Sequence, residues 1–392
     1  MSTSALFLLI LLHVVHPELL LVDPMAYQVY GTYQDKMVVI GGRNESINNG
    51  YIQYLDLNNK KADVIKSLNI PIVCHGKCFD QINNIIYFVS TINVYSVDLN
   101  ERSINAMTRI PINTTYGTGY SCVTINNDYN LYVMGGVLFN PRGQTTTSDN
   151  VQKYSILTGQ WNQMASMKSP RNAFTCEYYN ISIYIFGGSF GCCDWKTNID
   201  SYSETDNEWK TLNGIVKHGH TVRSILVKQL EQIIIVGGYY NNEYTNRVSI
   251  FNLLTLTLTS EIISINIRRG GVSLGYDTQS LAVYICGGRF GALNEEASYT
   301  NVCERISLTV SPTINPTNAP SMYPSNNPSV NPSINPTQTT IKYVVRTHIP
   351  TELYIYIGAA LFGCFLITTC SISFCIYKLK QQKMKNSAQE VD

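Results

Sequence analysis

The chain has few charged residues and almost no net charge. Charged residues make up 14% of its 392 residues, and 28 lysines and arginines nearly balance 27 aspartates and glutamates, giving a formal net charge of +1. A nucleic-acid-binding protein needs a cluster or an excess of positive charge to neutralise phosphates. The sequence therefore predicts no nucleic-acid partner.

The sequence also lacks catalytic and metal-binding motifs. It has no phosphate-binding glycine loop, no zinc spacing and no nucleophile elbow, and it holds only six histidines. Two of these, His218 and His220, would share one face of a strand and could bind metal, but a structural role at the start of a repeat is the better interpretation. Cys74 and Cys78, which flank His75, are better explained by a disulfide or by a strand-end pair than by a metal site. We expect no enzymatic activity, no cofactor and no bound metal.

Paired glycines behind short apolar runs recur about every fifty residues. The pairs are Gly41-Gly42, Gly135-Gly136, Gly187-Gly188, Gly237-Gly238 and Gly287-Gly288. The one wide interval, between the first two pairs, contains at its midpoint the similar apolar run 86–90 without the glycines. This spacing predicts six repeats, each a small unit that buries its faces only by stacking on its neighbours.

Each repeat has the composition of short strands. Val, Ile, Tyr and Phe dominate the apolar runs, and such residues favour strands over helices at this length. In the unit that contains Gly187, we expect strands at residues 174–178 and 181–187, joined by a tight turn. The other repeats predict the same arrangement of four strands.

The pattern resembles the kelch repeat, the unit of a family in which each repeat forms one four-stranded propeller blade. Besides the glycine pairs, the matching residues are Tyr154 with Trp161, Tyr202 with Trp209, the weaker Phe251, and the opening residues Arg171, Lys217 and His220. The resemblance covers roughly residues 27 to 310. It implies an all-β fold, a six-bladed kelch-type β-propeller.

The last repeat shows only three of its four strands, at residues 272–276, 281–287 and 302–308. A propeller ring must close on itself. We expect residues 18–22 to supply the missing strand if they remain in the mature chain.

Both ends of the chain carry apolar segments. Residues 5–15 are too short to span a bilayer and fit a secretory signal, with an uncleaved N-terminal strand as the alternative. Residues 353–377 carry no charge, and lysines follow them directly. We expect a signal peptide at 1–22, a transmembrane helix at 353–377 and a cytoplasmic tail at 378–392. The propeller, residues 23–310, would then be extracellular or lumenal in a single-pass type I protein of the plasma membrane or an endomembrane.

A proline repeat lies between the predicted propeller and the membrane helix. From Pro312 to Pro336 a proline occurs at every fourth position, and each is followed by Ser or Thr. Proline favours extended polyproline II structure, and the hydroxyls are acceptors for O-glycans. Residues 311–350 are therefore predicted to form a disordered stalk that holds the propeller away from the membrane.

Sequons and cysteines agree with an extracellular or lumenal location. N-glycosylation is predicted at Asn44, Asn113 and Asn180. Eight of eleven cysteines lie outside the predicted membrane helix, and an even number suits disulfides, with buried free thiols as the alternative. Cys286 and Cys303 are the best pair, because a symmetric hairpin would place them opposite each other.

Arginine and aromatic residues gather in loops at one end of the predicted propeller. Strand direction alternates, so the loops between second and third strands share this end with the connections between blades. The residues there are Arg43, Arg142, Arg171, Arg268, Arg269 and Arg289, with Trp195, Tyr239, Tyr240 and Phe290. Such residues often anchor binding surfaces, although ordinary solvated loops are the alternative. Glycans on Asn44 and Asn113 would cover blades one and two and leave blades three to six for an acidic or polyhydroxylated partner.

These features predict a cell-surface or endomembrane-lumenal protein that presents a propeller to a protein or glycan ligand. Two alternatives stay open. One is an extracellular oxidase or glycan hydrolase, because galactose oxidase carries copper-radical chemistry on a kelch-like propeller. The other is a structural coat protein without a specific ligand.

Overall fold

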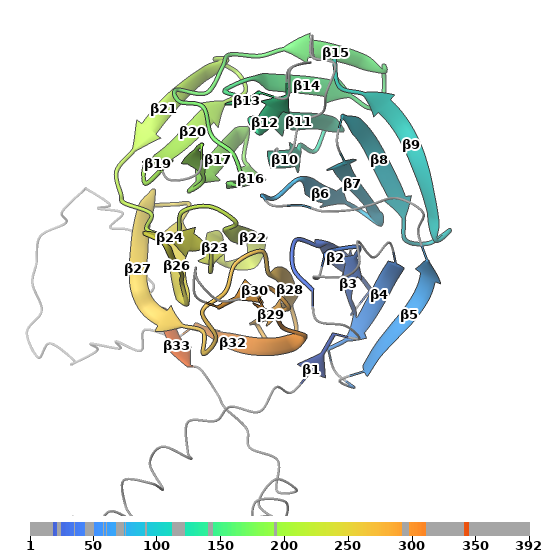
Figure 1. Cartoon of the computed structure of the whole chain (residues 1–392), viewed down its shortest axis with the longest axis vertical. Helices are drawn as coiled ribbons and strands as arrows, with labels where there is room; N and C mark the ends of the chain where they lie inside the picture. The colour runs from blue at the N-terminus through green and yellow to red at the C-terminus, as the bar shows by residue number, and fades with distance from the viewer. Residues whose placement is uncertain are drawn as a thin grey trace, which may run out of the picture. The chain divides into compact units, whose positions relative to one another are not determined.

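Six antiparallel sheets stand around a central axis as the blades of a propeller in the computed structural model of the chain (Figure 1). The structure describes residues 19–21, 25–34, 36–43, 51–57, 59, 61–67, 74, 76–90, 92–111, 122–139, 144–191, 194–291, 298–310 and 341–344. These residues belong to one unit that spans Pro17–Arg346. The prediction of an all-β, six-bladed propeller is confirmed.

The first five blades each contain four antiparallel strands in chain order. Blade one consists of β2 (Val29–Tyr33), β3 (Lys36–Ile40), β4 (Tyr51–Asp56) and β5 (Lys61–Ser67). Blade two consists of β6 (Phe79–Ile82), β7 (Ile85–Ser90), β8 (Asn93–Asp98) and β9 (Ser103–Arg109). Blade three consists of β10 (Cys122–Ile125), β11 (Asn130–Met134), β14 (Val151–Ser155) and β15 (Gln160–Gln163).

Blades four and five have the same order. Blade four consists of β16 (Thr175–Tyr179), β17 (Ser182–Phe186), β20 (Ile199–Ser203) and β21 (Glu208–Leu212). Blade five consists of β22 (Arg223–Val227), β23 (Gln232–Val236), β26 (Arg247–Asn252) and β27 (Thr257–Ser264), with the short 3-10 helix η1 (Lys228–Leu230) between its first two strands. The strands predicted around Gly187 correspond to β16 and β17 within about one residue.

Blade six is completed by segments from outside its own repeat. Its three consecutive strands are β28 (Ser273–Asp277), β29 (Ala282–Cys286) and β32 (Val302–Val310), and β1 (Leu19–Leu20) pairs with the first residues of β32. The expectation that residues 18–22 close the ring is confirmed by this pairing. A signal peptide must therefore end before Leu19 if β1 is to remain in the mature chain.

The far end of β32 is paired as well. β33 (Ile341–Val344) runs antiparallel to it, with Ile341 opposite Val310 and Val344 opposite Ser307. These four residues fall within the segment predicted to be the stalk. The outer edge of blade six is thus covered by chain from both sides of the repeats.

The glycine pairs follow the second strands, where the chain leaves the sheet. Gly237 and Gly238 have positive φ angles of 61° and 113°. A Cβ atom on Gly237 would lie 2.3 Å from the Arg269 carbonyl oxygen, and one on Gly238 would lie 2.2 Å from that of His218. Only glycine combines these φ values with so close an approach of neighbouring backbone.

Blade two needs no glycine pair because its chain turns back directly. β7 runs to Ser90, and β8 begins at Asn93, which is the register partner of Ser90. Neither Val89 nor Ser90 has a positive φ. This short turn explains how the second repeat keeps its strand pattern without the glycines.

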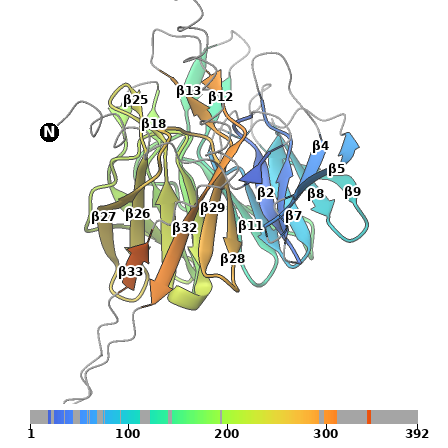
Figure 2. The ribbon, with the colours of Figure 1, turned by 90° about the horizontal axis from the view of Figure 1, so that it is seen from below.

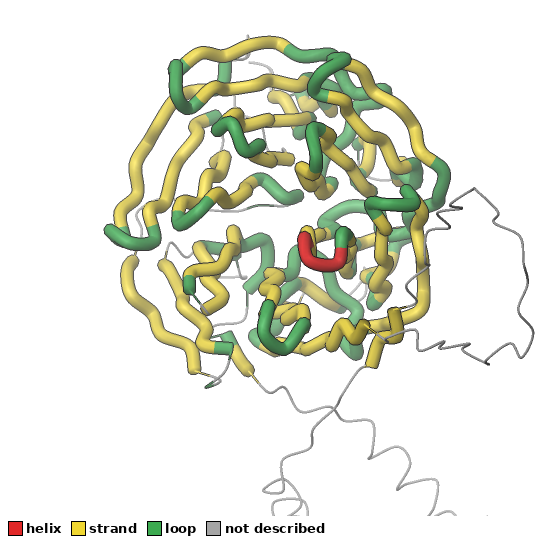
Figure 3. Tube along the Cα trace, turned by 180° about the vertical axis from the view of Figure 1, so that it is seen from behind, coloured by secondary structure: helices red, strands yellow, loops and turns green. Residues whose placement is uncertain are grey.

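In blades three to six, the chain beyond the glycines forms two-stranded ribbons at one end of the propeller (Figure 2). They are β12 (Val137–Phe139) with β13 (Thr145–Thr147), β18 (Ser189–Phe190) with β19 (Asp194–Trp195), β24 (Tyr239–Tyr240) with β25 (Glu243–Tyr244), and β30 (Arg289–Phe290) with β31 (Ser298–Tyr299). We call this end, formed by the ribbons and the connections between blades, the hairpin face. The helix η1 and the tight turns lie at the opposite end (Figure 3).

Single bridges tie the blade connections to the ribbons. Asn172 pairs with Ser189, and Gly270 pairs with Arg289. The predicted arrangement, in which connections between blades share an end with loops between second and third strands, is confirmed by these bridges.

The aromatic pairs of the repeat are cross-strand neighbours on the outer strands. Tyr154 is opposite Trp161, with ring centroids 4.9 Å apart, and Tyr202 is opposite Trp209 at 5.2 Å. Tyrosine and tryptophan that face each other across antiparallel strands pack their rings together. The seven-residue spacing between tyrosine and tryptophan therefore indicates a tight hairpin between the third and fourth strands of a blade.

Three disulfides lie within the described residues. The predicted bond between Cys286 and Cys303 joins β29 to β32, and these cysteines are register partners. Cys74 bonds Cys78, which is one of the two alternatives that the sequence left open. Cys122 bonds Cys176 and links the first strands of blades three and four. The alternative of free thiols does not hold for these six cysteines.

Several predictions fall on residues outside the described ranges. They concern the signal segment before residue 19, the glycosylation sites Asn44 and Asn113, the contact residue Arg142, the proline repeat, and the membrane helix and tail at 353–392. Among the residues that are described, no helix has the length and apolarity of a membrane span.

The turn between β16 and β17 should accept glycine with a gain in stability. Asn180 and Ile181 have positive φ angles of 46° and 61°, as in a hairpin turn that favours Asn-Gly. A β-branched residue rarely adopts this conformation, and Ile181 is 51% exposed, so it packs little. We expect Ile181→Gly to raise the free energy of unfolding by about 1 kcal/mol in denaturant titrations.

A matched variant tests the cause of that gain. Ile181→Ala keeps a Cβ atom and should gain less than Ile181→Gly, while both variants keep the sequon at Asn180. A loss of stability in Ile181→Gly would show that the isoleucine side chain stabilises the turn.

Candidate functional site

Aromatic side chains of blades four and five cluster on the hairpin face. The rings of Trp195 and His220 lie 5.1 Å apart, those of His220 and Tyr239 lie 5.0 Å apart, and Trp195 also contacts Tyr239 at 5.7 Å. Tyr240 lies 6.4 Å from Trp195, and Tyr244 lies 5.0 Å from Tyr239. We call these five residues the aromatic cluster. Each of them is half-buried and keeps part of its surface in solvent.

The ribbons and one bridge hold the aromatic cluster in place. Tyr239 and Tyr244 are register partners across the ribbon β24–β25, so both rings lie on one of its faces. His220, in the connection before β22, forms a bridge with Tyr239. Trp195 comes from β19, where it pairs with Ser189. Four separate backbone segments thus bring together residues that are far apart in the sequence.

A half-buried arginine from blade six adjoins the cluster. Burial opposes the charge of Arg289, but a hydrogen bond to Tyr27 and the neighbouring Tyr244 and Tyr299 raise its pKa above the usual value. Its Nε atom is buried without a hydrogen-bond partner. Among the described residues, no carboxylate forms an ion pair with its guanidinium group. Arg289 is therefore a fixed positive charge beside aromatic rings.

His220 is neutral at physiological pH. Burial, and to a lesser extent the charge of Arg289, lowers the pKa of His220 to about 4. A neutral imidazole has one nitrogen that donates a hydrogen bond and one that accepts. The cluster therefore combines apolar ring surface with groups that match hydroxyls.

Two of the arginines predicted for a binding face are instead fully buried. Arg171 forms an ion pair with Asp200 at 2.5 Å, and Arg269 forms one with Glu304 at 2.7 Å. Both guanidinium groups also donate to a carbonyl oxygen of their own blade's glycine pair. The prediction that Arg171 and Arg269 contact a ligand is wrong. Their side chains join the segment before the first strand of a blade to the third strand of that blade.

His218 takes the same place in blade five. Its Nδ1 lies 2.7 Å from the Gly237 carbonyl oxygen, and its Nε2 lies 2.8 Å from the Ser249 hydroxyl. Ser249 occupies the register position held by Asp200 in blade four and Glu304 in blade six. His218 is thus structural, as the sequence favoured, but it does not share a strand face with His220.

The other predicted contact residues remain at the surface. Arg268 is exposed and forms an ion pair with the exposed Glu243 at 2.7 Å. Trp195, Tyr239 and Tyr240 belong to the aromatic cluster, and Phe290 lies half-buried on β30. Arg43 is exposed in blade one and forms a bridge with Ala26. The structure thus brings together the part of the predicted face that lies in blades four to six.

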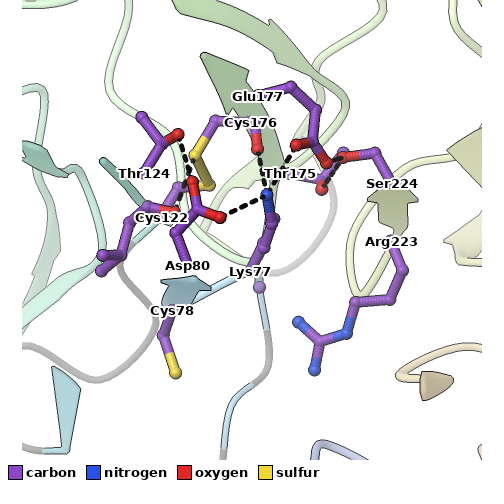
Figure 4. Close-up of a disulfide and its surroundings, with 12 residues drawn as sticks. Lys77, Cys78, Asp80, Cys122, Thr124, Thr175, Cys176, Glu177, Arg223 and Ser224 are labelled. Carbon is purple, nitrogen blue, oxygen red and sulfur yellow. Dashed lines mark hydrogen bonds and ion pairs between the residues drawn. A yellow bond between two sulfur atoms is a disulfide. The ribbon is translucent and has the colours of Figure 1, made fainter. Parts of the chain in front are cut away.

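A buried ionic network joins blades across the axis (Figure 4). Lys77 Nζ lies 2.7 Å from Glu177 and 3.8 Å from Asp80, and it donates to the Cys176 carbonyl oxygen. Ser224 donates to Glu177 at 2.7 Å. Burial opposes the charge on Lys77, but the two carboxylates together raise its pKa. The lysine therefore remains charged and joins blade two to blades four and five.

The segment that carries Lys77 is fastened to several blades. The Cys74 amide donates to the Tyr27 carbonyl oxygen of blade one, and the Lys77 amide donates to that of Phe174, just before blade four. Arg223 is fully buried and donates to the carbonyl oxygens of Cys74 and Val272. The buried charges at the axis are thus partnered within the chain, which indicates that they stabilise the ring.

The comparisons with known proteins agree with the blade geometry. The Kelch motif family model matches residues 118–168, which contain all of blade three, including Tyr154 and Trp161. The chain is a kelch-repeat propeller. A search of curated proteins found no significant match. Kelch propellers are commonly used for protein binding.

Some residues of this kelch propeller's sites were missed by sequence reasoning. Glu177 is the charged residue of β16, and a charge in the middle of the first strand of a blade could have indicated a buried ion pair. Its partner Lys77 carries no comparable signal. His220 and Tyr244 were missed as members of the aromatic cluster because a bridge and the ribbon register, not sequence distance, place them beside Tyr239. No group of three metal-binding side chains occurs within the described parts of the chain.

Proposed function

We propose that this kelch propeller is a binding protein of the cell surface or an endomembrane lumen. It would recognise a protein or glycan ligand through the hairpin face of blades four to six. The observation that carries this proposal is the half-buried aromatic cluster beside Arg289. Aromatic and arginine side chains held in place by their neighbours are the usual energetic centres of binding surfaces.

The end of the propeller opposite the hairpin face carries a predicted glycosylation site. β32 begins beside the glycine pair of blade six, since Val302 accepts a hydrogen bond from Gly287, and it runs to Val310 at the opposite end (Figure 2). Asn180, in the turn between β16 and β17, lies at the end away from the hairpin face and would carry its glycan there.

A glycan introduced on the hairpin face should block ligand binding. Glu243→Thr creates a sequon at Asn241, in the turn of the ribbon β24–β25. We expect the glycosylated full-length chain to lose at least tenfold in affinity for any protein or glycan that the wild type binds, measured on protein and glycan arrays. Steric exclusion of the ligand from the aromatic cluster is the reason.

Two variants control this experiment. Glu243→Gln removes the partner of Arg268 without creating a sequon and should bind normally. Leu254→Thr creates a sequon at Asn252, in the turn at the opposite end, and should also bind normally. Mobility on gels before and after N-glycosidase treatment shows whether each site, including Asn180, is occupied. Blocking by the glycan at Asn252 but not at Asn241 would contradict the proposal, as would the absence of any ligand or of any glycan on the wild type.

A further inference from the structure

We propose that the ligand of the hairpin face is a glycan that carries an acidic sugar. The sugar ring would stack on Trp195, and its carboxylate or sulfate would bind Arg289. This inference rests on the proposed function and specifies the chemistry of its ligand.

The stacking surface is provided by the aromatic cluster. Trp195 contacts three other rings, those of His220, Tyr239 and Tyr240, yet it stays half-buried, so its orientation is held while part of its surface faces solvent. One side of a sugar ring presents C–H groups that pack against an aromatic face, and the hydroxyls around it need polar partners. A rigid, partly exposed indole suits that requirement.

Hydrogen-bonding groups surround this indole. The neutral imidazole of His220 offers a donor and an acceptor, and sugar hydroxyls also donate and accept. Tyr240, whose ring centroid lies 6.4 Å from that of Trp195, adds a phenolic group. The pairing of ring surface with uncharged polar groups favours a sugar over an apolar ligand.

A single acidic group on the ligand is favoured by the charges around the cluster. Arg289 keeps its positive charge, and a guanidinium group binds a carboxylate or sulfate through two parallel hydrogen bonds. Other cations on the neighbouring ribbons are neutralised within the chain, since Arg268 pairs with Glu243 and Lys196 pairs with Asp194. One cation beside stacked rings matches one acidic sugar better than a run of acidic residues in a peptide.

Matched oligosaccharides test the inference. We would measure binding of the purified full-length chain to sialyllactose and lactose, to glucuronic acid and glucose oligomers, and to sulfated and unsulfated galactose oligomers. At least one acidic member should bind at least tenfold tighter than its neutral counterpart. Arg289→Gln should remove this preference, and Arg289→Lys should keep part of it. Trp195→Ala should weaken binding of both members of the pair by at least tenfold.

Two control variants replace the same types of residue, an arginine and an aromatic residue, outside the aromatic cluster. Arg268→Gln removes an exposed arginine outside the cluster, and Phe190→Ala removes an exposed aromatic residue from the same ribbon as Trp195. Both should bind as the wild type does, and thermal unfolding should show that every variant is folded.

The outcomes separate this inference from the proposed function. Binding of acidic peptides that depends on Trp195, with no binding of acidic glycans, would overturn the inference and leave the function of the hairpin face intact. An acid preference that survives Arg289→Gln in a folded protein, or no preference in any pair, would also overturn the inference. Binding that Trp195→Ala and the glycan at Asn241 both leave unchanged would overturn the inference and the proposed function together.

Discussion

Replacing Arg269 with methionine is expected to lower the free energy of unfolding by about 3–5 kcal/mol, as measured by denaturant titration. The guanidinium group of Arg269 is fully buried, pairs with Glu304 at 2.7 Å and donates to the carbonyl oxygens of Gly287 and Val302. Its removal leaves the Glu304 carboxylate buried without its cation and frees carbonyl groups of blade six. The loss should therefore be large.

The adjacent Arg268 provides the matched control. Its side chain is 62% exposed, and its partner Glu243 is 71% exposed. Exposed ion pairs contribute about 0–1 kcal/mol. Arg268→Met should therefore leave stability nearly unchanged. Equal losses in the two variants would show that Arg269 is not the structural residue described above.

Acidification from pH 7 to pH 4 should lower stability by about 3 kcal/mol through His218 alone. Burial, with a smaller contribution from the charge of Arg247, lowers the pKa of His218 from 6.5 to about 4. The hydrogen bond to the Gly237 carbonyl oxygen raises this pKa but does not offset the effect of burial. Between these values, the unfolded chain binds a proton at this histidine and the folded chain does not. Stability contributed by the neutral imidazole is thus complete above pH 6.5 and is lost as the pH falls toward 4.

His218→Gln isolates this contribution. Glutamine can donate to the Gly237 carbonyl oxygen and accept from the Ser249 hydroxyl, but it does not titrate. Denaturant titrations at several pH values should show that the wild type loses about 3 kcal/mol more than the variant between pH 7 and pH 4. Parallel pH profiles for the two proteins would refute the assignment, and they would indicate that carboxylates dominate acid unfolding.

The blade count and strand order could be predicted because they depend on local signals. The pair Gly237-Gly238 follows an apolar strand of predictable length, and Tyr202 with Trp209 reports the tight hairpin at the end of a blade. Closure by residues 18–22 was predictable because few segments outside the repeats could supply the strand that blade six lacks. The bond between Cys286 and Cys303 followed from hairpin symmetry.

Burial of individual arginines could not be predicted in the same way. Arg268 and Arg269 are neighbours, yet one is exposed and the other is fully buried. The difference depends on which side of the chain faces Glu304, a residue of another strand, and no local pattern shows that. Similarly, Lys77 meets Glu177 across the axis only because the ring brings blades two and four together.

Hydrogen exchange of the full-length chain, with and without its tightest-binding glycan or protein, would locate the ligand on the propeller. We expect slower exchange upon binding in segments 194–199, 218–222, 239–245 and 288–291 of the hairpin face. Exchange should stay unchanged in the turns at 179–183 and 252–257. Protection confined to those turns, with no change around Trp195 and Arg289, would show that the ligand binds the opposite end of the propeller and not the hairpin face.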